Sequence, residues 1–140
     1  MRVVRLRAPG GPEQLAVEKA DRPRPGPAEA LVRVHAAAIT RGELEWPIDR
    51  LPAIPSYELS GVVEEVGARV TGVAAGDEVF ALTPFDRDGV AAEYTALPAE
   101  LLVARPRALG MPRAPRSLCP RSRPGRDCST TAGSSPTSAR

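Results

Sequence analysis

The sequence predicts a mainly β domain, organised as a barrel or a sandwich, over residues 1–110. Apolar residues fall in short runs, and turns rich in glycine and proline separate these runs. Helical periodicity is weak throughout this part of the chain, so a series of short strands explains the pattern better than helices do.

The first predicted elements are two strands and a linker. Apolar side chains open a strand at residues 3–6, and a second strand is expected at 15–18, reached through the turn-prone residues 9–12. Residues 22–27 alternate arginine with proline or glycine, and proline has no N–H group to donate to a neighbouring strand. We therefore expect an extended linker there.

The remaining predicted strands follow in order. Residues 29–39 give the strongest pattern, and residues 59–66 form another strand in which Gly61 indicates a bulge or a close approach of two backbones. A Gly-Asp turn then leads into a strand at 78–82, and runs at 89–97 and 101–104 complete the set. Only residues 40–46 are expected to form a short turn of helix.

Residues 111–140 show no pattern of a folded domain. They carry six arginines against one acid, Asp127, and they hold both cysteines, Cys119 and Cys128. The positive net charge of the chain therefore comes from this tail, and it does not indicate a nucleic-acid-binding face on the first part. The first part has no cysteine, so it offers neither a disulfide nor a cysteine zinc site.

The composition of the tail is typical of GC-rich DNA translated in a wrong frame. New codons can be built from the third base of each tail codon and the first two bases of the next. Across residues 121–133, synonymous choices then permit the reading LTAWQGLLDHGG. We interpret the tail as the product of a single-base frameshift near Gly110. The alternative is a genuine disordered tail, rich in arginine and proline.

The sequence carries no targeting signal in its first residues. Residues 1–7 alternate instead of forming the apolar stretch of a signal peptide. No run approaches the roughly 20 apolar residues of a membrane span. We therefore expect a cytoplasmic protein that binds neither a membrane nor nucleic acid.

One run, residues 54–67, carries a specific resemblance. It reads Ile-Pro-Ser-Tyr-Glu-Leu-Ser-Gly-Val-Val-Glu-Glu-Val-Gly, and it follows an alanine-rich strand end and a polar turn at 34–44. A Gly-Asp turn and a strand come after it, at 76–80. In this order the features resemble the GroES-like N-terminal domain of the medium-chain dehydrogenase/reductase superfamily. The resemblance covers nearly all of residues 1–110, and it implies a partly open β-barrel with short helical turns, normally followed by a Rossmann domain that is missing here.

Two departures from the superfamily pattern indicate its zinc-independent, quinone-oxidoreductase-like branch. Zinc alcohol dehydrogenases place a cysteine after the alanine-rich strand and a histidine before the motif glutamate. This sequence has Ile39 and Thr40 at the first place and Tyr57 at the second, and none of these is a usual zinc ligand. The four-cysteine zinc lobe is also missing. The resemblance thus implies no metal site, NADPH as cofactor, and a quinone, an enone or another small carbonyl compound as substrate.

The resemblance also places residues 40–46 and 56–58 at the cofactor cleft. Without zinc, charge on the acceptor oxygen must be stabilised by hydrogen-bond donors, so Thr40 and Tyr57 are the candidate catalytic residues. Thr40 and Arg41 are the candidate cofactor-binding residues, for the nicotinamide ribose and for a phosphate or a developing oxyanion. Trp46 is the candidate wall for an aromatic substrate.

Each candidate has a structural alternative. Thr40 would only cap a turn, and Tyr57 would pack beneath the barrel with its hydroxyl satisfied. Arg41 would be a solvated charge, and Trp46 would belong to the core. Glu58 matches the motif glutamate, and without zinc we expect it to bind loop amides in a structural role.

The sequence thus predicts the N-terminal catalytic-domain fragment of a zinc-independent, NADPH-dependent oxidoreductase that is inactive as this chain and forms a homodimer in its full-length form. Two alternatives remain open. One is a non-enzymatic GroES-like binding or assembly module. The other is a zinc alcohol dehydrogenase, which the two missing ligands disfavour.

Overall fold

The computed structural model describes residues 1–46 and 50–105, and this part of the chain holds seven strands and three short 3₁₀ helices. The strands are β1 (Arg2–Leu6), β2 (Leu15–Lys19), β3 (Glu29–Ala38), β4 (Glu58–Val66), β5 (Glu78–Leu82), β6 (Tyr94–Pro98) and β7 (Val103–Ala104). The helices are η1 (Pro12–Gln14), η2 (Gly42–Glu45) and η3 (Ala99–Leu101). The predicted mainly β class is confirmed. The predicted tail at 111–140 and its frameshift lie outside the described residues.

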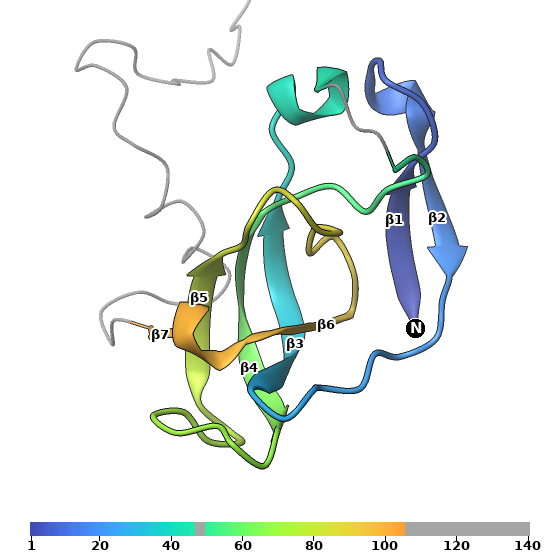
Figure 1. Ribbon diagram of the computed structural model, residues 1–140. Coiled ribbons are helices and arrows are strands. Elements are labelled where there is room, and N and C mark those ends of the chain that lie inside the picture. The colour runs from blue at the N-terminus through green and yellow to red at the C-terminus, as the bar shows by residue number, and fades with distance from the viewer. Residues whose placement is uncertain (47–49, 106–140) are drawn as a thin grey trace, which may run out of the picture.

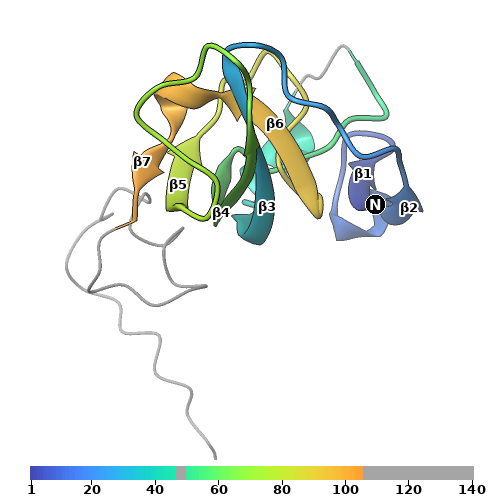
Figure 2. The ribbon, with the colours of Figure 1, turned by 90° about the horizontal axis from the view of Figure 1, so that it is seen from below.

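The strands form two antiparallel sheets that lie side by side (Figures 1 and 2). β1 pairs with β2, and the larger sheet has the order β6-β3-β4-β5-β7. The loop before β6 joins the sheets: Val4 donates its N–H to the Ala91 carbonyl at 2.8 Å, and Val34 donates to the Glu93 carbonyl at 2.9 Å. Over the described residues both sheets are open, as a partly open barrel requires.

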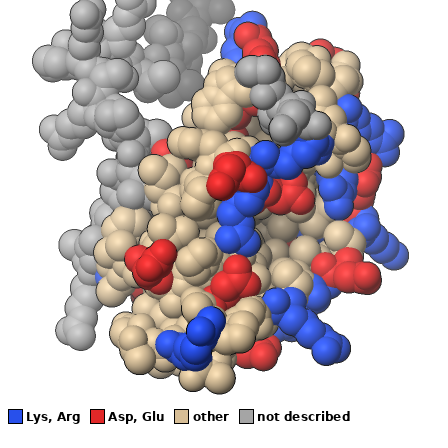
Figure 3. All heavy atoms as spheres, viewed as in Figure 1, with Lys and Arg blue, Asp and Glu red and all other residues tan. Residues whose placement is uncertain are grey.

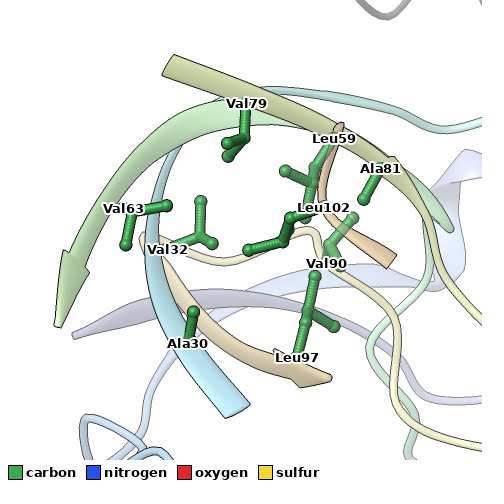
Figure 4. Close-up of a cluster of buried hydrophobic side chains, with 9 residues drawn as sticks. All are labelled: Ala30, Val32, Leu59, Val63, Val79, Ala81, Val90, Leu97 and Leu102. Atoms are coloured by element: carbon green, nitrogen blue, oxygen red, sulfur yellow. The ribbon is translucent and has the colours of Figure 1, made fainter. Parts of the chain in front are cut away.

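The large sheet curls around a cluster of buried apolar side chains (Figure 4). The cluster consists of Ala30, Val32, Leu59, Val63, Val79, Ala81, Val90, Leu97 and Leu102. On β5 the buried Val79 and Ala81 alternate with outward-facing neighbours, because successive side chains of a strand point to opposite faces. Each fully buried Leu or Val contributes about 1.5–3 kcal/mol relative to an exposed one, so this cluster is the main source of stability.

Gly61 lies where β3 and β4 approach closely. It stands opposite Val34 in the register, and the pairing of the two strands is irregular between Val34 and Ala36. A Cβ atom at Gly61 would lie 2.4 Å from the Arg33 carbonyl oxygen, a distance that side chains do not adopt. The predicted close approach at this glycine is confirmed.

One predicted strand starts later than expected. The run at 89–97 gives β6 only from Tyr94 onward. The N–H groups of residues 89–91 instead donate to the carbonyls of residues 54–56, at 2.7–3.1 Å. The backbone of 89–91 is thereby held against the segment that precedes β4, and it cannot join β3. The predicted strand at 101–104 is likewise reduced to β7, because η3 occupies its start.

Candidate functional site

The candidate site lies at one end of the large sheet, near η2 (Figure 1). In the antiparallel register Ala38 stands opposite Glu58, and Glu58 stands opposite Leu82. The end of β3, the start of β4 and the end of β5 therefore meet at one edge. Three loop segments adjoin this edge, residues 39–46 and 50–57 of the connection between β3 and β4, and residues 83–90 after β5, and together we call them the site corner. All four predicted site residues lie in the first two of these loops.

Thr40 and Arg41 lie in the first loop, and both are exposed. They line a cavity of about 660 Å³ between η2 and the glycine turn at 10–13. Ile39 and Leu44 give this cavity apolar walls. Thr40 and Arg41 thus line the same hollow, which has the mixed apolar and polar lining of a small-molecule site.

Trp46 and Tyr57 meet in an aromatic cluster with Phe85. The Trp46 and Tyr57 rings are stacked with centroids 6.0 Å apart, and Phe85 meets the Tyr57 ring edge-on at 4.8 Å and the Trp46 ring at 5.3 Å. Tyr57 is 4% exposed, whereas Trp46 and Phe85 are 39% and 55% exposed. Trp46 is therefore a surface aromatic outside the core cluster. The two exposed rings offer apolar faces on which a planar molecule can pack.

Arg50 holds the third loop against this cluster. Its Nη2 lies 2.8 Å from the Phe85 carbonyl oxygen, 2.5 Å from the Arg87 carbonyl oxygen and 3.5 Å from the Tyr57 hydroxyl oxygen. A guanidinium has donors only, so the Tyr57 oxygen is the acceptor in the third contact. The hydroxyl proton of Tyr57 is then available to another acceptor.

Glu43 joins the first loop to the second. Its side chain is 4% exposed. One carboxylate oxygen accepts the Thr40 N–H at 2.6 Å, and the other accepts the Ser56 N–H at 2.7 Å. Glu43 thus binds loop amides, the structural role that was expected for Glu58, and Glu58 is the first residue of β4.

Ser56 adopts a backbone conformation that is unusual for its residue type. Its φ angle is 73°, in the left-handed region, and the residue is fully buried. Such a conformation costs a non-glycine residue about 1–2 kcal/mol, so it persists only where surrounding contacts fix it. The Glu43 bond to its N–H is one such contact, and the hydroxyl bond to the Glu58 carbonyl at 3.3 Å is another.

Within residues 1–46 and 50–105, no three His, Cys, Asp or Glu side chains come together as a metal-binding group. None of the helices in those residues is long and apolar enough to cross a membrane. On the face of the molecule seen in Figure 3, acidic and basic side chains are interspersed.

The structure thus brings Trp46 and Tyr57 together, and it connects Thr40 to the Tyr57 loop through Glu43. Arg41 faces the neighbouring cavity and is not part of the aromatic cluster. The sequence analysis missed Glu43, Arg50 and Phe85, each of which contacts at least one residue 13 or more positions away in the sequence. Of these three, only Phe85 could have been recognised from the sequence, as a large aromatic residue within a polar turn after a strand.

Comparison with known proteins places this fold in a family. The profile of the alcohol dehydrogenase GroES-like domain matches residues 26–107. L-threonine 3-dehydrogenase of Pyrococcus horikoshii is 31% identical over 121 residues, covering 64% of this chain and 35% of that protein. 2-Methylene-furan-3-one reductase of Solanum lycopersicum is 32% identical over 99 residues, covering 61% of this chain and 26% of that protein.

A comparison with solved structures gives the same result as the comparison with these relatives. The Escherichia coli quinone oxidoreductase complexed with NADPH superposes with a TM-score of 0.74 at 25% identity, covering 84% of this chain and 37% of that one. The chain therefore spans little more than a third of such proteins, or less. Because the domain profile covers more than half of the chain, the chain belongs to the alcohol dehydrogenase GroES-like domain family, the N-terminal domain of the medium-chain dehydrogenases/reductases.

Proposed function

We propose that this chain is the substrate-side domain of a zinc-independent, NADPH-dependent reductase of quinones, enones or similar conjugated carbonyl compounds. The observation that carries the proposal is which residues, Thr40 and Tyr57, occupy two positions of the site. Where the zinc enzymes of the superfamily hold metal ligands, Thr40 lines a cavity and Tyr57 lies within an aromatic cluster. A hydroxyl donor and a phenol support polarisation of a carbonyl by hydrogen bonds.

The residues around the cavity fit one end of a dinucleotide. The Thr40 hydroxyl suits a ribose hydroxyl, and the Arg41 guanidinium suits a phosphate, for which arginine is the preferred partner. When bound, the nicotinamide supplies the hydride for the reduction. In this proposal Thr40 and Arg41 hold the cofactor, and the walls formed by Ile39 and Leu44 exclude water from the ring.

In this proposal the aromatic cluster binds the acceptor and polarises its carbonyl group. Trp46 and Phe85 orient a planar acceptor against their exposed faces. Tyr57 donates its hydroxyl proton to the acceptor oxygen as negative charge develops there. Arg50 favours this orientation of the hydroxyl because it already occupies the phenol oxygen as a donor. The positive charge of Arg50 also stabilises any negative charge that builds up on that oxygen.

The full-length protein is proposed to include a Rossmann domain encoded beyond a frameshift near Gly110, and to act as a cytoplasmic homodimer. Most nucleotide contacts in this superfamily come from that second domain. We therefore expect the 140-residue chain to bind NADPH weakly and to turn over no substrate. A titration that gives micromolar NADPH affinity for this chain would contradict the expectation.

The decisive experiment is to resequence the gene from the codon for Arg105 to well past the codon for Arg140 and to express the product in the restored frame. The proposal predicts NADPH oxidation with quinones or enones, a fall of about a hundred-fold in kcat for Tyr57→Phe if the phenol stabilises the oxyanion, and no zinc by metal analysis. Stoichiometric zinc with alcohol oxidation would instead support a zinc alcohol dehydrogenase. A confirmed reading frame and no activity would support the non-enzymatic binding module.

A further inference from the structure

The buried carboxylate of Glu43 ties together the two loop segments, residues 39–46 and 50–57, of the connection between β3 and β4. The Thr40 N–H reaches one of its oxygens at 2.6 Å, and the Ser56 N–H reaches the other at 2.7 Å. The same loops meet again where Trp46 stacks on Tyr57 at 6.0 Å. The Glu43 bridge and the ring stacking therefore join the two loops at two places. A single connection would let one loop rotate against the other, and two connections prevent this rotation.

The chemistry of the bridge requires a carboxylate. Each oxygen faces an N–H donor, and hydrogen bonds to an ionised acceptor are about twice as strong as neutral ones. A glutamine at this position has one acceptor and one donor, so it can bind only one of the two amides. An aspartate has two acceptors on a side chain that is shorter by one methylene group, so it cannot span both amides without movement of a loop.

At the Ser56 end of the bridge, the contacts fix the course of the backbone that leads into Tyr57. Ser56 is held at a φ of 73°, and its carbonyl accepts the Val90 N–H at 2.7 Å. The Tyr57 carbonyl accepts the Thr83 N–H at 2.7 Å. With its N–H bound to Glu43 as well, the backbone around Ser56 is held from both sides, and the direction in which Tyr57 leaves the backbone is set.

We infer that Glu43 is a positioning residue that holds the Thr40 loop and the Tyr57 loop as one rigid unit before any ligand binds. The inference rests on the proposed function, because it assigns to Glu43 the task of fixing the spacing between the two proposed catalytic donors. Glu43 itself is buried and touches the loop amides, so it acts on the reaction only through those donors. Its loss alters the geometry of the donors and leaves the binding surface of Trp46 and Phe85 in place.

The first test uses the 140-residue chain and compares Glu43→Gln with Glu65→Gln. Glu65 is exposed on β4 and gives the same change of charge far from the site corner. In the unmodified chain the amide protons of Thr40 and Ser56 should lie downfield in the NMR spectrum. In Glu43→Gln at least one of them should move upfield, while the emission of Trp46, the only tryptophan, should stay unchanged. Glu65→Gln should change neither signal, and equal spectra for the two variants would overturn the inference.

The second test uses the frame-restored enzyme. A misplacement of about 1 Å far from the chemistry can cost a hundred-fold in rate, so kcat of Glu43→Gln should fall about ten-fold to a hundred-fold while KM stays within about two-fold. Glu43→Asp should also lower kcat while KM stays nearly constant, and the fall in kcat should be smaller. A rise in KM with unchanged kcat would overturn the positioning role. If the unmodified enzyme reduces neither quinones nor enones, the proposed function fails, and the amide shifts alone decide whether the bridge exists.

Discussion

The core of the large sheet and the site corner are stabilised by opposite kinds of contact. In the core, apolar side chains such as Leu59 and Leu97 are fully buried against one another. In the site corner, Glu43 and Arg50 bind backbone groups of the loop segments, and Ser56 is held in a costly conformation. The sheet is thus stabilised by many interchangeable contacts, whereas the shape of the site depends on a few specific ones. Damage to the core should unfold the domain, and damage to the site corner should change its geometry first.

The largest effect should come from the core. Leu59→Ala on β4 removes a fully buried side chain from the cluster, and such changes cost about 2–5 kcal/mol of unfolding free energy. Urea unfolding followed by circular dichroism would measure the loss. Leu82→Ala is the matched control, because Leu82 ends the neighbouring β5 and is 52% exposed. Its effect should stay within about 0.5 kcal/mol, and equal losses for both variants would show that the cluster is not the stabilising core.

A second change tests the site corner by overpacking. A Cβ atom at Gly89 would lie 2.2 Å from the Ser56 carbonyl oxygen, so Gly89→Ala must push the third loop away from the second. The expected cost is about 1–3 kcal/mol, together with a shift in Trp46 emission because the site corner moves. Gly42→Ala is the control, since a Cβ atom there meets nothing within 4 Å. A stable Gly89→Ala protein with unchanged emission would contradict the close approach.

The same contrast explains how much could be predicted from the sequence. The strand at 78–82 and the turn of helix near η2 follow from alternation and local turn chemistry, so their positions were predicted to within a residue or two. The start of β6 was placed too early, because the N–H groups of residues 89–91 bind residues 54–56, a pairing that no local pattern encodes. Within the site corner, the position of Thr40 after its strand was predictable, but its link to Ser56 through Glu43 depends on two loops meeting in space.

A smaller effect should come from Ser56, where two contributions oppose each other. Ser56→Gly removes about 1–2 kcal/mol of backbone strain but also loses the hydroxyl bond to the Glu58 carbonyl, worth about 0.5–1.5 kcal/mol. The net change in unfolding free energy should therefore lie within about 1 kcal/mol. Ser56→Ala loses the bond and keeps the strain, so it should be less stable than Ser56→Gly in the same urea experiment. The reverse order would show that the left-handed conformation carries no strain.

The smallest effect should come from a polar contact that, unlike Glu43, lies at the surface. The backbone N–H of Arg2 donates to the Glu93 carboxylate at 2.9 Å and the Arg2 side chain donates at 2.8 Å, which lowers the pKa of Glu93 below its ordinary value of 4.5. Because the folded-state pKa is the lower one, this contribution to stability is fully present above pH 4.5 and is lost as the pH falls through the folded value. Urea unfolding of the unmodified chain and of Glu93→Gln should therefore differ near neutral pH and converge in acid. Solvent and salt screen this exposed pair, so the difference should be small and should shrink further at high ionic strength. A difference in unfolding free energy that stays constant from neutral pH into acid would mean that the ionised carboxylate of Glu93 contributes nothing to stability. The surface carboxylate would then contribute even less, relative to the buried carboxylate of Glu43, than the structure indicates.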